Sequence, residues 1–149
     1  MRTEFFVEKF ESVLDKLKAE IEQYPNDESL CVRDSSINNA AGNLCLHLMG
    51  NLNHYVGAGI GKSGYVRDRP LEFEDRDITR EKLLSRLEAT RGVVLDSLRS
   101  LGDGRLSEAY VGGGSNEQEG SIEEELLGIL THFNYHLGQI NYHRRLTVK

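Results

Sequence analysis

The sequence has few cysteines and no long uninterrupted apolar run, and both absences narrow the class of protein. Its two cysteines, Cys31 and Cys45, are too few for the disulfide framework of a secreted domain, and Cys45 falls within an apolar helical pattern typical of a buried free thiol. The opening stretch MRTEFFVEKFESVLDKL alternates apolar and charged residues, so it lacks the apolar core of a signal peptide, and no later run approaches the length of a membrane span. We therefore expect a soluble protein of the reducing cytoplasm.

The sequence also lacks a basic cluster. Its 149 residues carry a net charge of −6 with Lys and Arg dispersed, which gives no electrostatic footprint for nucleic acid or for an anionic membrane. A chain of this length can bury one core without disulfides. We expect a single domain over residues 1–149, with neither nucleic acid nor a membrane as a partner.

No strand signal competes with a helical periodicity that recurs in four segments. Apolar residues at three- and four-residue spacing predict helices over residues 3–23, from Ile37 to the glycine-rich stretch at Gly57, over 79–101, and from Ser121 to Ile140. Thr79 is the predicted N-cap of the third helix, and Ser121 forms a capping box with Glu124 at the start of the fourth. The glycine-rich connection over residues 102–120 leaves room for a short hairpin.

Four amphipathic helices of similar length predict an all-α fold, a four-helix bundle. The connection from Val56 to Ile78 is much longer than a tight antiparallel turn needs, so it can run the length of the bundle. The order is then up-down-down-up, with a long crossover between the second and third helices and with the second and fourth helices antiparallel. An ordinary up-down bundle, in which this connection forms a functional lid, is the alternative.

Two glycine-rich stretches lie between the predicted helices. GAGIGKSG, residues 57–64, misses the GxxxxGK[ST] spacing of a phosphate-binding loop by one residue and follows a helix instead of a strand. A hinge or lid is the better interpretation. VGGGSNEQEG, residues 111–120, has the composition of a solvated loop.

The histidines are concentrated on two predicted helices. At about 100° per residue, His132, His136 and His143 fall in a narrow band of the fourth helix, beside its apolar stripe. On the second helix, His47 and His54 lie on one line at the flank of the apolar stripe. His132 and His136, four residues apart, can direct two imidazoles at one ion, and a third ligand must come from a neighbouring helix.

Competing interpretations of these histidines remain open. A lone histidine beside an apolar stripe is more often a surface residue or a hydrogen-bonded core residue than a ligand. Phe133, Asn134 and Tyr135 separate the pair, so the carboxylate of the zinc-protease HExxH motif is missing and peptide hydrolysis is not expected. His54 and His143 each lie roughly 10 Å along the bundle from the expected site, beyond a metal–nitrogen bond of ~2 Å. They either line the cavity or are exposed near helix ends.

Three stretches together resemble a known family. NLCLHLMGNL on the second helix, HFNYHLGQI on the fourth and the intervening YVRDRPLEFE are similar to the DinB-like (damage-inducible, YfiT-like) superfamily of metal-binding four-helix bundles. The resemblance implies that His47, His132 and His136 bind a divalent metal ion (zinc, nickel, manganese or iron) and leave coordination positions open to water. Members of that superfamily include thiol S-transferases and a thiol-dependent isomerase, and many have no assigned chemistry. Members often pair, which favours a homodimer, as do Phe5, Ile21 and Val93 near the edges of their apolar stripes.

Two functions of different classes follow. In the first, the protein is a metal-dependent transferase in which a low-molecular-weight thiol loses its proton at the ion and attacks a small electrophile. In the second, the ion only ties the second helix to the fourth, and function lies in an association surface. Asn43, Asn51, Glu125 and Gln139 project near the two histidine-bearing faces, and Asn43 and Gln139 are the predicted orienting residues unless they make only ordinary interhelical hydrogen bonds.

Overall fold

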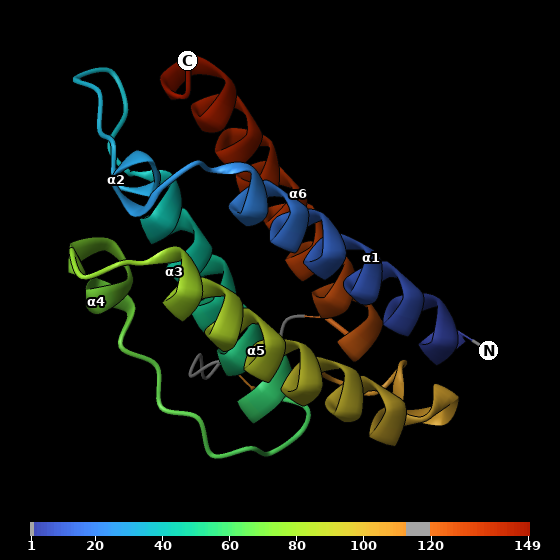
Figure 1. Cartoon of the computed structure of the whole chain (residues 1–149). Coiled ribbons are helices and arrows are strands. Elements are labelled where there is room, and N and C mark those ends of the chain that lie inside the picture. The colour runs from blue at the N-terminus through green and yellow to red at the C-terminus, as the bar shows by residue number, and fades with distance from the viewer. Residues whose placement is uncertain (1, 113–119) are drawn as a thin grey trace.

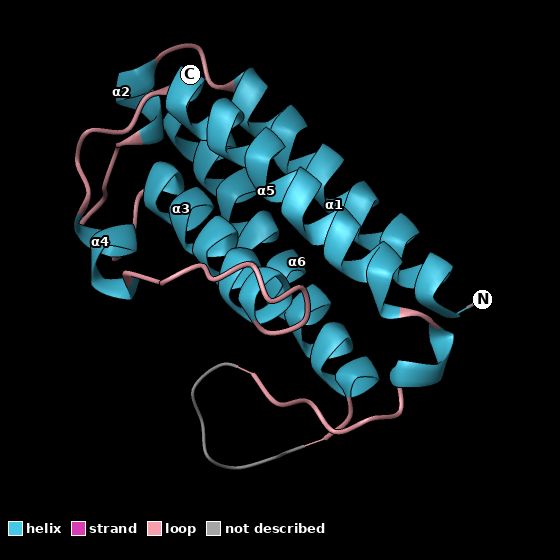
Figure 2. Ribbon diagram, turned by 90° about the horizontal axis from the view of Figure 1, so that it is seen from below, coloured by secondary structure: helices cyan, strands magenta, loops and turns pink. Residues whose placement is uncertain are grey.

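Four long helices dominate the computed structural model, which describes residues 2–112 and 120–149. They are α1 (Arg2–Gln23), α3 (Ala41–Leu52), α5 (Arg80–Leu101) and α6 (Ile122–Thr147). Two short helices, α2 (Asp27–Leu30) and α4 (Arg69–Glu74), lie in the connections, α3 continues as a π-helical segment η1 (Asn53–Ala58), and a 3₁₀ turn η2 (Asp103–Arg105) follows α5. The described residues form no strand (Figure 2). The predicted all-α bundle is therefore confirmed.

The long helices run up, down, down and up, as Figure 1 shows. The N–H of Thr3 at the start of α1 donates to Asp103 Oδ1 just beyond α5 (2.9 Å), and Arg80 at the start of α5 contacts the carbonyl of Tyr24. These contacts make α1 and α5 antiparallel. Helices α1 and α6 are parallel, because Arg2 pairs with Glu123 near their starts. The long connection is a crossover and not a lid over an up-down bundle.

Local sequence signals set most of the helix ends. The Thr79 hydroxyl accepts the N–H of Lys82 (3.2 Å), and the predicted capping box of Ser121 and Glu124 is present at the start of α6. Ile78 and Leu83, on either side of the Thr79 cap, are both buried. These caps define where α5 and α6 begin, whereas α3 begins after Ala40 without a side-chain cap.

The start of the second helix was predicted too early. Helix α3 begins at Ala41, and Ile37 lies in a loop with 39% of its surface exposed. Asp34 explains the difference, because its carboxylate accepts the N–H of Ser36 (2.9 Å) and its carbonyl accepts the N–H of Ile37 (3.1 Å). This side-chain turn competes with helix formation.

The connection between α5 and α6 contains an isolated bridge between Ala109 and Ser121 but no strand among its described residues. The expected hairpin is thus reduced to one bridge, and most of the loop over 111–120 lies outside the described residues. The other glycine-rich stretch, residues 57–64, begins with Gly57 and Ala58 at the end of η1. It therefore continues from a helix and does not follow a strand.

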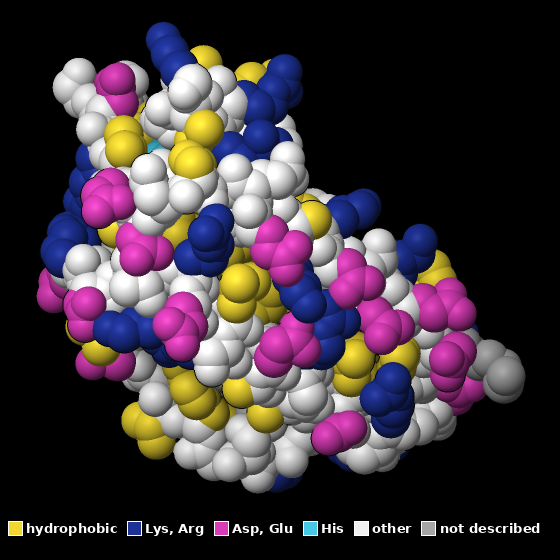
Figure 3. Space-filling model, viewed as in Figure 1, with side chains coloured by type: hydrophobic (Ala, Val, Ile, Leu, Met, Phe, Trp, Pro, Cys, Tyr) yellow, Lys and Arg dark blue, Asp and Glu magenta, His cyan; other side chains and the backbone are white. Residues whose placement is uncertain are grey.

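The core is formed by apolar side chains of all four long helices. Cys45 is fully buried within it as a free thiol, and Cys31, also free, is half-buried. On the face drawn in Figure 3, Lys and Arg side chains alternate with Asp and Glu and form no large patch of one sign. Within the described part of the chain, no helix is both long and apolar enough to cross a membrane.

Candidate metal centre

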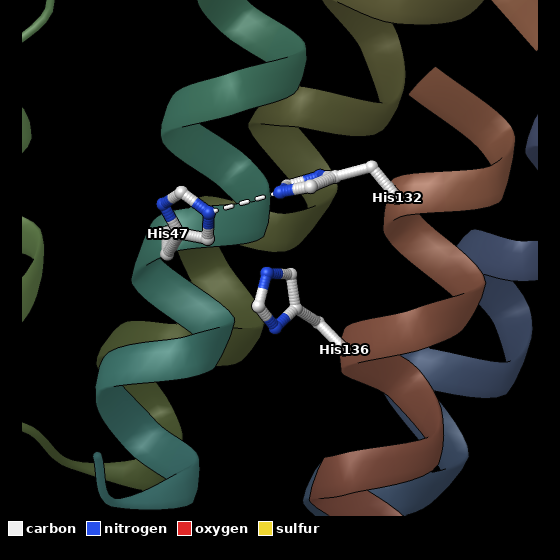
Figure 4. Close-up of side chains that lie close together, drawn as sticks. All are labelled: His47, His132 and His136. Atoms are coloured by element: carbon white, nitrogen blue, oxygen red, sulfur yellow. Dashed lines mark hydrogen bonds between the residues drawn. The ribbon is translucent and has the colours of Figure 1, made fainter. Parts of the chain in front are cut away.

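Helices α3 and α6 bring three histidines together between them. His47 comes from α3, and His132 and His136 come from successive turns of α6 (Figure 4). One ring nitrogen of each lies within 4.8 Å of one ring nitrogen of the other two, and the Nε2 atoms of His47 and His132 are 3.1 Å apart. The described residues therefore contain a three-histidine cluster that could hold a metal ion.

Hydrogen bonds on the outer side of two rings determine which nitrogen faces the cluster. His47 Nδ1 lies 3.0 Å from Glu72 Oε1, and His136 Nδ1 lies 2.7 Å from Gln139 Oε1. Both partners are acceptors, so each Nδ1 carries the proton and each Nε2 keeps a lone pair. Arg67 also approaches His47 Nδ1 (3.3 Å), but a guanidinium has no acceptor atom. The N–H at Nδ1 therefore donates its hydrogen bond to Glu72. The Nε2 lone pairs are thus left for the interior of the cluster.

The spacing of these nitrogens fits a metal ion. Two nitrogen ligands of a tetrahedral ion with bonds of about 2.0–2.1 Å lie about 3.4 Å apart, close to the 3.1 Å between His47 and His132. Without a cation, one of these two rings must donate its Nε2 proton to the other. If His132 donates, its Nδ1 becomes a buried acceptor, and if an ion holds its Nε2, the same atom becomes a buried donor; in both states it has no hydrogen-bond partner among the described residues. An ion could bind the Nε2 lone pairs of both rings at once.

Two of the three imidazoles, those of His132 and His136, have pKa values shifted toward the neutral form that binds metals. Burial lowers the pKa of His132 to about 4, and the charges of His136, His47, Arg67 and Arg69 act in the same direction. Burial also lowers the pKa of His136, although the Gln139 hydrogen bond opposes this. Protons therefore compete weakly for His132 and His136 near neutral pH.

Behind His47 lies a buried ion pair carried by the crossover. Glu72 on α4 accepts from Arg67 Nε (2.8 Å) and Nη2 (2.9 Å) as well as from His47. Burial would raise the pKa of Glu72, but the hydrogen bonds from His47 and Arg67 outweigh it and hold the pKa below its usual value. Asn43 donates to the backbone carbonyls of Glu72 and Asp75 (both 3.0 Å), which fixes α4 against α3.

Glu72 and Arg67 were not among the predicted site residues, although both lie in YVRDRPLEFE. Two signals were available, since Asp68 caps α4 by accepting the N–H of Leu71 and Pro70 occupies its first turn, which together predict a short helix within the crossover. Of the two predicted orienting residues, Gln139 contacts His136 directly, as expected. Asn43 does not orient an imidazole. It positions α4 by donating to the backbone carbonyls of Glu72 and Asp75.

The two remaining histidines lie outside the cluster, as the register predicted. His54 belongs to η1 and packs against Tyr55, with ring centroids 4.8 Å apart. His143 is buried. The predicted alternative in which it is exposed near a helix end is therefore wrong. His143 Nδ1 lies 2.8 Å from the Tyr24 hydroxyl, which donates to the carbonyl of Ile140 (3.1 Å), and its Nε2 donates to the carbonyl of Val32 (2.8 Å). The loop after α2 covers this end of α6, and sequence periodicity does not show that.

The fold and this site together define the class: an all-α bundle with a three-histidine cluster able to hold a metal ion. Residues 3–148 match the family model described as "Protein of unknown function (DUF1572)", so the chain belongs to this family. A search of curated proteins and a search of solved structures each returned no match. The family description does not itself name the DinB-like superfamily.

Proposed function

We propose that the protein binds one divalent metal ion through the Nε2 atoms of His47, His132 and His136 and uses it to activate a small thiol. The observation that carries the proposal is the cluster itself, three imidazoles whose ligand atoms lie within 4.8 Å of one another. Three protein ligands with a remaining open position are typical of catalytic zinc sites, whereas structural sites are closed by four. When bound, the ion would lower the pKa of a thiol or water in the open position.

The proposed reaction is the transfer of a low-molecular-weight thiol to a small electrophile, in line with the resemblance to DinB-like proteins. A lone pair of the thiolate sulfur forms the new carbon–sulfur bond, the leaving group departs with the electron pair of its broken bond, and the thiol proton passes to solvent. His47 and His136 are held by Glu72 and Gln139 with their protons on the outer nitrogens. These two imidazoles therefore serve as fixed ligands and not as bases.

A cavity of about 470 Å³ beside α6 supports a small-molecule substrate. Gln139 lines it and contacts His136 Nδ1, on the side of that ring away from the cluster, and none of the three cluster histidines lines the cavity. Leu44, Tyr142 and Leu146 supply apolar surface, and Asn38 supplies a polar amide. This size and this mixture of surfaces are typical of ligand pockets.

Cobalt substitution tests the proposal. Co(II)-loaded protein is titrated with 2-mercaptoethanol and followed by its ultraviolet sulfur-to-cobalt charge-transfer band, and the loaded protein is then assayed for conjugation of the thiol to a chlorinated aromatic electrophile. We expect a saturable band and metal-dependent conjugation. Cobalt binding without any thiol-dependent band would reject the thiol chemistry and leave metal binding standing.

The second candidate is a non-enzymatic bundle in which the ion ties α3 to α6 and function lies in an association surface. Its support is a set of exposed apolar side chains along α6. These are Leu127, Tyr135, Tyr142 and Leu146. Pairing of two copies through this face would give the expected homodimer. Two of the residues that favoured a homodimer from the sequence differ in exposure. Phe5 is 47% exposed, but Ile21 is fully buried and cannot contact a second copy. Sedimentation at micromolar concentration that shows only a 16.8 kDa species would reject the dimer.

The free thiols of Cys31 and Cys45 support a location in the reducing cytoplasm, which is part of the proposal.

A further inference from the structure

We infer that Glu72, itself held by Arg67, is a positioning residue that fixes His47 with its Nε2 toward the cluster and adds no net charge to the site. The inference rests on the proposed metal binding, and it assigns to the crossover a part in the site that neither the histidine pattern nor the family description contains. Three sets of contacts support it.

The first is the pairing of buried charges. Glu72 is 6% exposed, and the side chain of Arg67 is 10% exposed. A buried carboxylate is costly unless it is paired and hydrogen-bonded, and two short bonds from Arg67 supply the pair. The pair of Glu72 and Arg67 is neutral as a unit. Glu72 can therefore accept the hydrogen bond from His47 Nδ1 without placing an uncompensated anion beside the cluster.

The second is the space made for the carboxylate on α3. A Cβ built on Gly50 would lie 1.8 Å from Glu72 Oε2, so any side chain at position 50 would displace the carboxylate. Gly50 follows His47 by three positions and therefore lies on the same face of α3. The glycine lowers helix propensity, and the close approach of Glu72 accounts for its presence.

The third is the anchoring of the crossover and of the His47 ring. The two bonds from Asn43 to the carbonyls of Glu72 and Asp75 hold α4 at the level of His47. The ring of Phe73 packs on the His47 ring with centroids 4.9 Å apart, so it restricts ring rotation. Helix α4 thus presents a hydrogen-bond acceptor and an apolar wall to one imidazole. That arrangement fixes both its tautomer and its orientation.

A structural ion pair would stabilise the fold but would not control metal affinity, and this difference can be measured. Partners behind a ligating histidine typically change metal affinity 10–100-fold when they are mutated. We therefore expect Glu72→Gln to weaken Zn(II) binding at least tenfold in a chelator competition. The matched control is Glu20→Gln, because Glu20 forms a similarly buried pair with Arg144 (2.8 Å) on α1 and α6. The control should bind Zn(II) within twofold of wild type.

Gly50→Ala separates position from charge, since it keeps Glu72 and Arg67 but displaces the carboxylate. It should weaken Zn(II) binding at least tenfold as well. Gly92→Ala on α5, where a Cβ would meet no atom within 4 Å, is its control and should leave affinity unchanged. Gly50→Ala also decides the question if Glu72→Gln does not fold.

Nitrogen-15 NMR of the metal-free protein gives a readout that does not depend on metal. His47 should be protonated on Nδ1 alone in the wild type and in Glu20→Gln, and it should populate both tautomers in Glu72→Gln and Gly50→Ala. Wild-type-like affinity and tautomer in these two variants would overturn the inference, as would an equal loss of affinity in Glu20→Gln. If the wild type binds no Zn(II), the proposed function fails, and the tautomer measurement alone decides whether Glu72 positions His47.

Discussion

The Nε2 atoms of His47 and His132 lie 3.1 Å apart, although 85 positions separate the two residues in the chain. Their rings meet nearly edge to face, with an interplanar angle of 72°. Such an approach of two ring nitrogens leaves at least one without a proton to donate, and Glu72 occupies the outer nitrogen of His47. Two ring nitrogens at this distance could both bind one ion.

The metal-free protein should lose stability as the pH falls from about 6.5 to about 4. The folded-state pKa of His132 is about 4, below the ~6.5 of an unfolded histidine, so the unfolded chain binds more protons between these values. The contribution of the neutral His132 ring to the free energy of unfolding is therefore complete above pH 6.5 and is lost as the pH approaches 4. Thermal unfolding of wild type and His132→Gln without metal, measured across this range, checks it. The melting temperature of the wild type should fall more steeply, and parallel curves would contradict the assignment.

Tyr24→Phe should lower the free energy of unfolding by about 1–3 kcal/mol, because it removes a buried hydroxyl that bonds both the carbonyl of Ile140 and His143 Nδ1. Urea unfolding of the metal-free protein measures the change. Tyr142→Phe is the control, since Tyr142 is 63% exposed, and its change should lie within about 0.5 kcal/mol. Equal stability of the Tyr24 variant and wild type would show that the hydroxyl is not needed there.

Cys45 should not react with Ellman's reagent in the native protein at pH 8. Burial raises its pKa to about 12, and the thiolate is the reactive form. Cys31 is only half-buried, although burial raises its pKa too, so it should react slowly. Cys31→Ser should therefore show no native reaction and one thiol after unfolding. A rapidly reacting thiol in the native Cys31 variant would mean that α3 opens readily.

Much of the fold could be predicted because its signals are local. The caps at Thr79 and Ser121 predicted α5 and α6, and the length of the crossover favoured the observed order of the helices but left an up-down bundle open as the alternative. Gln139 was found for the same reason, since it follows His136 by three positions on one helix face. The start of α3 was misplaced because apolar spacing extended to Ile37, and the Asp34 turn that ends the pattern is a side-chain contact.

The parts of the site that were missed depend on contacts between distant segments. Glu72 reaches His47 only because the crossover docks on α3, and Gly50 signals this approach only once the two segments are placed together. Exposure of His143 was one of two alternatives left open by the sequence, because this residue lies close to the end of α6. Its burial comes from Tyr24 and the Val32 loop, which no periodicity along α6 shows.

The central claim is that His47, His132 and His136 are the ligands of one divalent ion, and metal content per chain tests it most directly. Wild type, His47→Ala, His132→Ala, His136→Ala and the control His54→Ala are saturated with Zn(II) at pH 7.5, freed of loose metal by gel filtration and measured by elemental analysis. The account predicts about one ion per chain in the wild type and in His54→Ala and close to none in the other three, since two imidazoles no longer hold the ion. Equal metal content in the wild type and His136→Ala, or loss from His54→Ala with retention in His47→Ala, would contradict it.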